Sequence, residues 1–410
     1  MITLLHNGGD LVKLDGALSN LTVLDLTRVV AGPYCGSIFG DMGARVIKIE
    51  QPGTGDDARH YAPHVNGESA YYANLNRNKD GITLNLKHPK GKEIFLKLVE
   101  KADIVIENFR PGVMDKLGIG YDVLKKINPR LIYGAISGFG SYGRYSDRPG
   151  YDIISQAMGG LMSLTGPKGS NPTRSGNAKG DMLGGMNLAI GILAAVNARG
   201  MTGHGQRVDV ALVDSVVASL ENVFARYFDN GEIPARNGNA YASISPYDSY
   251  KAKDGYVIIA CGNQNLYEIM CNELINMPEL ISDERFATVP LRVQNNEELK
   301  IYIEQWTGKH TVDEVVEAAL SKRVPAGPIY DVGQIVVDPH IAQDRQMFID
   351  IEHPIIGKMK VNGNPIKMME TMPKIYKPSP VLGQHNKEIL CEMLDMTEAD
   401  VSELSEQGVL

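Results

Sequence analysis

The sequence is poor in cysteine, and its few thiols lack the spacing of a metal site or a disulfide framework. Cys35, Cys261, Cys271 and Cys391 lie far apart among the 410 residues, with no CxxC pair and no Cys/His zinc pattern. The first ten residues also lack a basic segment followed by an apolar run, so we expect no secretory signal. We therefore expect reduced thiols, no bound metal and a cytoplasmic protein.

An excess of positive charge is missing as well. The chain has 41 Lys and Arg against 49 Asp and Glu, a formal net charge of -8, which argues against nucleic acid or an anionic membrane as partner. The most apolar stretch, residues 182–198, contains Asn187 and Asn197 and is shorter than the roughly 20 residues of a membrane-spanning helix. We expect it to be a buried helix of a soluble core.

The common catalytic motifs are absent, and one motif that is present does not fit its usual setting. The sequence contains no HExxH, P-loop, GxSxG or EF-hand pattern. Gly138-Phe-Gly140-Ser-Tyr-Gly143 has the GxGxxG spacing and follows an expected strand at 131–136, but it runs into the loop 144–149. A dinucleotide site requires a helix at that point. We therefore interpret these glycines as a turn.

Short apolar segments alternate with helical ones in the first half of the chain. Segments typical of strands occur at 21–26, 44–50, 104–107 and 131–136, with helical patterns from residue 31 and at 92–100. Such alternation predicts a parallel sheet covered by helices, hence an α/β fold. Beyond the apolar helix, a strand is expected at 207–211 and a helix at 213–227.

The length exceeds what one hydrophobic core usually supports, so we expect two domains. Residues 1–228 are predicted to form a large domain. A linker rich in Gly, Pro, Asn and Ser follows at 229–250, and a smaller α/β domain is expected at 251–335. Residues 336–410 are interpreted as a second linker and a C-terminal segment that returns to the large domain.

Asp181 immediately precedes the apolar helix, in the segment Asn177-Ala-Lys-Gly-Asp181-Met-Leu-Gly-Gly-Met186. A carboxylate at the N-cap or in the first turn is stabilised by the helix dipole and the free amides. Local sequence alone therefore favours a helix cap over a catalytic group. The wider sequence pattern favours catalysis.

Six blocks occur in an order that resembles the family III CoA-transferases, the formyl-CoA transferase or CaiB/BaiF type. They are 31–33, 41–50, 107–112, 128–133, 137–140 and 203–209. The resemblance implies a Rossmann-like large domain with a smaller α/β domain, in two chains interlocked as a homodimer. It also implies that Asp181 is the nucleophile of a transfer of CoA from a short acyl-CoA to a free carboxylic acid.

In this reaction the acceptor would be a short mono- or dicarboxylate such as oxalate, formate, acetate or succinate, and CoA is a substrate, not a permanently bound cofactor. Mixed-anhydride and aspartyl-CoA thioester intermediates are expected. The resemblance places the acyl groups near Tyr71, Tyr151, Gly262, Asn263 and Gln264. It places CoA near Val30, Ala31, Gln51, Leu84 to Lys87, Asn108, Phe109, Arg110, Lys116, Pro149, Gly150 and Asp152. Some relatives carry an arginine at the position of Gln51.

Two alternatives remain open at this point. The racemases of the same fold carry histidine in a Gly-His-Asp turn, whereas this sequence reads Gly150-Tyr151-Asp152. A tyrosine, with an ordinary pKa near 10, is a poor base at neutral pH, which disfavours racemisation. A non-catalytic acyl-CoA binding protein would keep the CoA segments but would not need Asp181.

Overall fold

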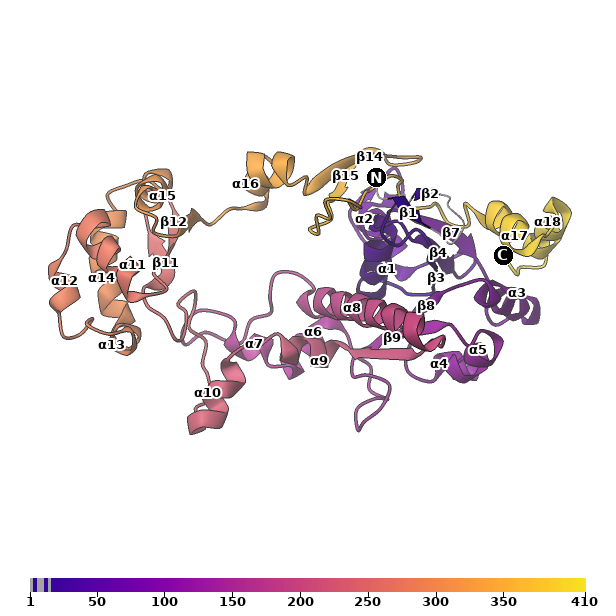
Figure 1. The fold of residues 1–410 in the computed structure, drawn as a ribbon, viewed down its shortest axis with the longest axis horizontal. Helices are drawn as coiled ribbons and strands as arrows, with labels where there is room; N and C mark the ends of the chain where they lie inside the picture. Colours follow the sequence, from indigo (N-terminus) through magenta and orange to yellow (C-terminus); the bar gives the residue numbers. More distant parts are fainter. Residues whose placement is uncertain (1–2, 6–10, 14–15) are drawn as a thin grey trace. The chain divides into compact units, whose positions relative to one another are not determined.

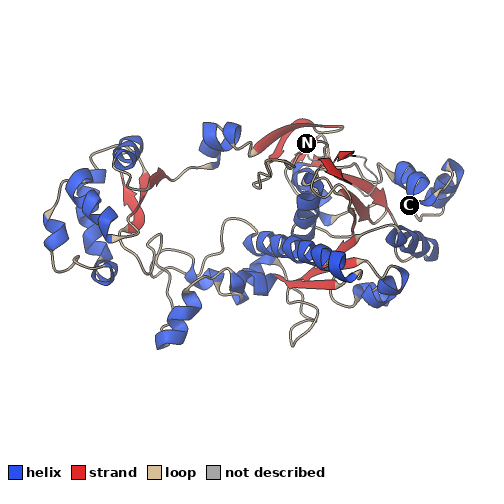
Figure 2. Ribbon diagram, viewed as in Figure 1, coloured by secondary structure: helices blue, strands red, loops and turns tan. Residues whose placement is uncertain are grey.

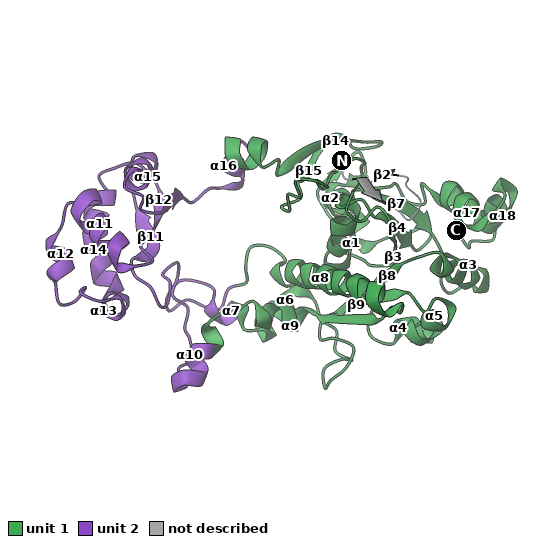
Figure 3. Ribbon diagram, viewed as in Figure 1, with its two compact units in different colours: residues 1–161, 174–224, 339–410 green, residues 162–173, 225–338 purple. Residues whose placement is uncertain are grey.

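The computed structural model describes residues 3–5, 11–13 and 16–410 (Figure 1). The chain divides into two compact units, drawn in green and purple in Figure 3. Unit 1 comprises Met1–Leu161, Arg174–Phe224 and Pro339–Leu410, and unit 2 comprises Met162–Thr173 and Ala225–Asp338. The chain thus leaves unit 1, builds unit 2 and returns, so the C-terminal residues belong to the same unit as the first strands.

A six-stranded sheet forms the centre of unit 1, and all its neighbouring strands are parallel. In spatial order the strands are β10 (Arg207–Ala211), β9 (Ile132–Ser137), β8 (Ile104–Glu107), β3 (Thr22–Asp25), β4 (Arg45–Glu50) and β7 (Lys79–Thr83). The chain runs from β3 outward to β7, then returns to β8 and runs outward the other way. This is the order of dinucleotide-binding folds, whose ligands bind where the direction reverses. Here the reversal lies between β3 and β8.

Apolar side chains cover both faces of this sheet, as expected for parallel strands. The helices that contribute to this core are drawn in blue around the red strands in Figure 2. On one face, Val23, Ile104 and Ile132 pack with residues of α1 (Ala31–Asp41) and α8 (Lys179–Thr202). On the other, Leu24 and Val105 pack with α3 (Pro89–Glu100), α5 (Tyr121–Ile127), α17 (Asn386–Leu394) and α18 (Glu398–Glu406). The C-terminal helices are therefore part of the core of unit 1.

Shorter elements complete unit 1. The hairpin partners are β1 (Thr3–Leu5) with β2 (Leu11–Lys13), β5 (His64–Val65) with β6 (Glu68–Ser69), and β14 (Phe348–His353) with β15 (Gly357–Asn362). The helices are a 3-10 turn (Asp57–His60), α2 (Ala70–Leu75), α4 (Val113–Lys116), α6 (Asp152–Met158), α9 (Leu212–Ala218) and a π turn (Pro339–Asp344). Helices α7 (Leu161–Leu164) and α10 (Val223–Asn230) lie where the chain passes between the units.

Unit 2 is built on a three-stranded antiparallel sheet, β11 (Tyr247–Lys251), β12 (Tyr256–Ala260) and β13 (Ala326–Pro328). Its helices are α11 (Gln264–Ile269), which continues as a π turn (Met270–Leu274), α12 (Glu279–Ser282), α13 (Val289–Gln294), α14 (Asn296–Thr307), α15 (Val312–Ser321) and α16 (Val332–Ile335). Arg292 is fully buried in this core, where it donates to the carbonyls of Ser245 and Phe286 at 2.9 and 2.8 Å. These bonds join the linker segment to the helices.

The structure corrects one expected helix and extends two others. The pattern at 213–227 predicted a single helix, but α9 ends at Ala218 and α10 begins at Val223. Between them Glu221 has a φ of +53°, a left-handed conformation that interrupts a helix, and Leu220 turns into the core. Helix α3 begins at Pro89, earlier than residue 92, because His88 caps it and proline fits its first turn.

The apolar helix α8 runs from Lys179 to Thr202, longer than the stretch 182–198. By length and composition alone it could cross a membrane, and a third of its most apolar window is buried. In the structure it packs beside α1, α9 and β9. These contacts bury one side of α8 in the core of unit 1.

Candidate active site

Two pockets lie in unit 1 at the edge where the parallel strands end. The β4–β7 pocket, about 580 Å³, is lined mainly by residues that follow β4 and β7, together with the segment after β3. The Asp181 pocket, about 310 Å³, is lined by residues that follow β3, β8 and β9 and by Asp181 itself. Both volumes fall near the ~300–1,000 Å³ typical of small-molecule sites.

Most residues expected to contact CoA line one of these pockets. The Asp181 pocket contains Val30, Ala31, Asn108, Phe109, Arg110, Pro149 and Gly150, together with the expected acyl-site residue Tyr151. The β4–β7 pocket contains Gln51, Leu84, Lys87 and, again, Phe109. Lys116 is exposed at the end of α4 and Tyr71 is half-buried on α2. Neither of them lines either of these two pockets, and nor does Asp152.

Asp181 occupies the third position of α8, in the first turn, and the N-cap residue is Ala178, which supplies no side-chain cap. The cap comes from α6 instead: the carboxylate of Asp152 accepts from the amides of Gly180 at 2.8 Å and Asp181 at 3.3 Å. A Cβ at residue 180 would collide with Ser155, so glycine is required for this approach. Asp152 therefore fixes the backbone that carries Asp181.

The Asp181 side chain is partly buried, and its carboxylate has no hydrogen-bond or ion-pair partner among the residues that the structure describes. Burial, and then the negative charge of Asp152, raise its pKa to about 7. An acid with a shifted pKa on a pocket wall is a candidate for chemistry. Near neutral pH a large fraction of Asp181 is ionised and able to attack an electrophile.

The start of α1 lies against the first turns of α8. A Cβ at Gly185 would come within 2.5 Å of the Ala31 carbonyl oxygen, so only glycine allows the two helices to approach this closely. Helix α1 has Val30 as its N-cap, again without a side-chain cap. Amides at the start of a helix lack an intrahelical acceptor and favour negatively charged groups. The start of α1, at Val30 and Ala31, and Asp181 therefore line one pocket.

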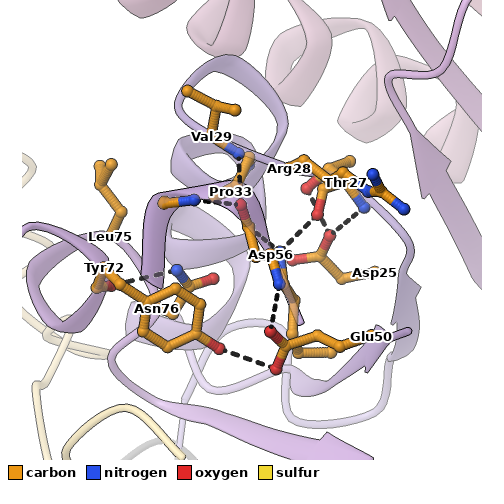
Figure 4. Close-up of polar contacts among 12 residues, drawn as sticks. Asp25, Thr27, Arg28, Val29, Pro33, Glu50, Asp56, Tyr72, Leu75 and Asn76 are labelled. Carbon is orange, nitrogen blue, oxygen red and sulfur yellow. Dashed lines mark hydrogen bonds and ion pairs between the residues drawn. The ribbon is translucent and has the colours of Figure 1, made fainter. Parts of the chain in front are cut away.

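A buried charge network holds the turn between β3 and α1 (Figure 4). Val29 adopts a φ of +66°, which is strained for a β-branched residue, and its amide donates to Asp56 at 3.0 Å. Asp56 also pairs with Lys48 at 2.9 Å, and both side chains are fully buried. Lys48 also donates to the carbonyl of Thr27. The network compensates for the strain and fixes the backbone that precedes Ala31.

Two tyrosines lie close to Asp181. The ring of Tyr71 meets that of Tyr61 edge to face, with centroids 5.8 Å apart, and Tyr61 lines the Asp181 pocket. Burial, and then the nearby charge of Asp181, raise the pKa of Tyr71. Tyr151, the N-cap residue of α6, lines the pocket but is 71% exposed. Tyr71 is therefore protonated near neutral pH.

Known proteins match this chain over most of its length. The model of "CoA-transferase family III" matches residues 18–386. A succinyl-CoA:mesaconate CoA-transferase of Haloarcula hispanica is 41% identical, with 92% of this chain and 96% of the relative covered. An acetyl-CoA:oxalate CoA-transferase of Acetobacter aceti is 42% identical, with 87% of this chain and 90% of the relative covered. The crystal structure of a CaiB/BaiF family protein from Brucella suis superimposes with a TM-score of 0.81, 39% identity, and coverage of 92% and 99%.

The chain belongs to CoA-transferase family III. This confirms the resemblance that the six sequence blocks indicated. The protein is a CoA-transferase that acts on an acyl-CoA and a carboxylate, and the α/β fold with its six-stranded parallel sheet is the fold of the family.

In this CoA-transferase the expected acyl-site loop 262–264 belongs to unit 2 and is described there by itself. Asn263 caps α11 by accepting from the Leu266 amide at 2.9 Å, and Gln264 donates to Glu268 at 3.0 Å. A Cβ at Gly262 would meet open space. Cys261 is buried at the end of β12, and burial raises its pKa to about 12, so it is a packing residue. A role of 262–264 in catalysis stays a prediction.

Sequence reasoning did not single out Arg28, Asp57, Tyr61 and Arg148, which line the Asp181 pocket, and it interpreted Gly138 only as part of a turn. Arg28 and Gly138 follow strands β3 and β9, so the rule that ligands bind at the ends of parallel strands could have identified them. Gly138 also explains the GxGxxG motif, since a Cβ there would come within 2.6 Å of the Gly150 Cα. The motif brings two loops of the pocket together.

Proposed function

We propose that this enzyme transfers CoA from a short acyl-CoA, such as succinyl-CoA, to a short dicarboxylic acid, with Asp181 as the nucleophile. The observation that carries the proposal is the position of Asp181 at the wall of a pocket lined by expected CoA-binding residues. Its carboxylate has no hydrogen-bond partner within the described part of the chain, and its pKa is raised to about 7. The activity of the family requires a carboxylate that can attack a thioester and later leave.

The proposed reaction begins when a carboxylate oxygen of Asp181 attacks the thioester carbonyl carbon. The carbon–sulfur bond breaks, and a mixed anhydride and CoA thiolate form. The thiolate attacks the aspartyl carbon of the anhydride, releasing the donor acid and leaving an aspartyl-CoA thioester. The acceptor carboxylate then attacks this thioester and displaces the thiolate. Attack of the thiolate on the acceptor acyl carbon forms the new acyl-CoA and restores Asp181, without net gain or loss of protons.

The charge around the pocket supports anionic substrates. Three arginines, Arg28, Arg110 and Arg148, line the Asp181 pocket against the two acids Asp57 and Asp181. This local excess of positive charge occurs in a chain of net charge -8, and it suits phosphate and carboxylate groups. The named relatives act on mesaconate and oxalate, both dicarboxylates, which further supports a dicarboxylic acceptor here.

We also propose that the enzyme is cytoplasmic and forms the interlocked homodimer expected from its family. Exposed apolar side chains on two helices of the chain support association: Met186 and Ile190 on α8, and Tyr227 and Phe228 on α10. Size-exclusion chromatography with light scattering should give about twice the 44.8 kDa of one chain. A mass equal to one chain would contradict the dimer without affecting the proposed chemistry.

Mass spectrometry of acyl-CoA products tests the reaction directly. Purified enzyme is incubated with succinyl-CoA and either glutarate or pentanoate, acceptors of equal carbon number that differ in the second carboxylate. We expect glutaryl-CoA to form faster than pentanoyl-CoA, and both to vanish in Asp181→Asn. Equal rates would refute the dicarboxylate preference. Full activity of Asp181→Asn would refute the nucleophile, and α-proton exchange without an acceptor would favour a racemase.

A further inference from the structure

The β4–β7 pocket and the Asp181 pocket meet at two residues. Arg28 and Phe109 are the only residues that line both the β4–β7 pocket and the Asp181 pocket in the described part of the chain. Arg28 follows β3 and Phe109 follows β8, so they flank the point where the strand order reverses. A ligand that extends from one pocket to the other must pass Arg28.

The structure holds Arg28 firmly at this boundary. Its amide donates to Oδ1 of Asn108 at 2.8 Å, and its carbonyl accepts from Nδ2 of Asn108 at 2.7 Å, so one side chain fixes both backbone groups. The residue next in the chain is Val29, whose amide is bound to the buried Asp56. The backbone of Arg28 therefore needs little reorganisation when a ligand binds.

The guanidinium of Arg28 is available to a ligand. It lies 5.5 Å from the centroid of the Phe109 ring and 3.9 Å from Asp57, a long ion pair between side chains that are 37% and 61% exposed. Such a pair contributes little and is readily exchanged for a stronger partner. Phosphate is a stronger partner, because guanidinium can bind two of its oxygens at once.

CoA carries a diphosphate between its adenosine and its pantetheine arm. If the thioester reaches Asp181, as the proposed function requires, the arm occupies the Asp181 pocket and the adenosine is left for the larger β4–β7 pocket. The diphosphate then falls at the boundary. In that larger pocket Gln51 is uncharged, and Lys87 supplies a positive charge but does not line the Asp181 pocket. We propose that Arg28 binds the diphosphate of CoA.

The test compares Arg28→Gln with the native enzyme on three thioesters that differ only in the nucleotide part. They are succinyl-CoA, its 3′-dephospho form and succinyl-pantetheine, which lacks the diphosphate. We expect kcat/KM to fall roughly 10- to 100-fold for the first two, the loss typical of one charged hydrogen-bonding pair. With succinyl-pantetheine the variant should equal the native enzyme. Arg28→Lys should recover part of the loss.

A matched control is Arg144→Gln, which removes an exposed arginine that lines neither pocket. It should match the native enzyme on all three thioesters. An equal loss on all three in Arg28→Gln would show that Arg28 acts on the acyl end or on the fold, and no loss would place the diphosphate elsewhere. A loss with succinyl-CoA alone would assign Arg28 to the 3′-phosphate. Each of these results overturns the proposal.

A binding measurement separates this proposal from the proposed function. Isothermal titration calorimetry with CoA itself requires no turnover, and Arg28→Gln should raise the dissociation constant by the same factor as it lowers kcat/KM. If the native enzyme binds CoA but exchanges no acyl group, the proposed reaction fails while the role of Arg28 is still measured. If the two variants at 28 and 144 bind CoA equally well, the role of Arg28 is refuted.

Discussion

The pKa of Asp181 implies that this carboxylate destabilises the folded protein at neutral pH. In the fold, burial and Asp152 raise the pKa from 3.8 to about 7, whereas in the unfolded chain it returns to about 3.9. Because the unfolded chain releases this proton more readily, the free energy of unfolding decreases as the pH rises above about 4. The loss is complete above pH 7. The sign is opposite to that of an acid in a salt bridge.

The size of the effect follows from the shift. At pH 8 the full difference of about 3 pKa units lowers the free energy of unfolding by at most ~4 kcal/mol. At pH 5, which is only ~1 unit above the pKa in the unfolded chain, the loss is about 1.5 kcal/mol. Replacing the carboxylate with the isosteric amide of asparagine removes this penalty. It also removes a favourable interaction with the helix dipole, worth about 0.3–1 kcal/mol. We therefore compare the free energy of unfolding of Asp181→Asn with that of the native protein at each pH. The difference in favour of the variant should be about 2–3 kcal/mol larger at pH 8 than at pH 5.

Urea unfolding of both proteins at pH 5, 6, 7 and 8 measures this difference. The single tryptophan, Trp306, lies in unit 2, so far-UV circular dichroism is the better probe for unit 1, which holds Asp181. Asp147→Asn, which alters an exposed carboxyl group on a loop, is the matched control. The reasoning would be refuted if the difference in free energy of unfolding between Asp181→Asn and the native protein stayed constant with pH or decreased toward pH 8.

Four further outcomes are expected. The kcat/KM of the native enzyme should rise about tenfold per pH unit up to about pH 7 and then level off, because only ionised Asp181 can act as the proposed nucleophile. Asp152→Asn should move this rise to lower pH, since it removes a negative charge that raises the pKa of Asp181. A flat profile from pH 5 to 8 would contradict this prediction. Asp56→Asn should lower the free energy of unfolding by about 3–5 kcal/mol, measured by urea denaturation, because Lys48 stays buried without its charge partner. Gly185→Ala, whose Cβ would press on Ala31, should lower the free energy of unfolding by about 1–3 kcal/mol and raise KM for acyl-CoA. Gly200→Ala on the same helix, where the Cβ meets open space, should change neither quantity. Iodoacetamide should label Cys391 first in the native protein and reach the buried Cys35 and Cys261 only after unfolding, as peptide mass mapping would show.

Much of unit 1 could be predicted from the sequence because its signals are local. The strands at 44–50 and 104–107 are short apolar runs, and the structure has β4 at Arg45–Glu50 and β8 at Ile104–Glu107. The expectation of one helix at 213–227 was wrong because the apolar spacing continues across the interruption between α9 and α10. That interruption depends on tertiary packing, in which Leu220 is buried. The earlier start of α3 had a local signal, the proline at 89, which the apolar spacing did not include.

The candidate site divides in the same way. Motifs predicted Asp181 and the CoA segments as candidates, whereas the residues that contact them come from distant parts of the chain. Asp152 lies 29 residues before Asp181, and its bond to the Asp181 amide depends on how α6 meets α8. Similarly, the pairing of Lys48 with Asp56 could not be distinguished in the sequence from two solvated charges. Sequence spacing carries no information on burial of this kind.

The order of the strands accounts for what the sequence could not supply. Residues 28 and 108 are 80 positions apart, yet they bond because β3 and β8 are neighbours at the point where the sheet reverses direction. Had β8 been added beside β7 instead, the segment after β3 would lie away from the segment after β8, and no pocket could join Arg28 to Phe109. The position of Arg28 between the two pockets is thus a consequence of topology, and this is why its proposed role can be tested by removing one charge without altering Asp181.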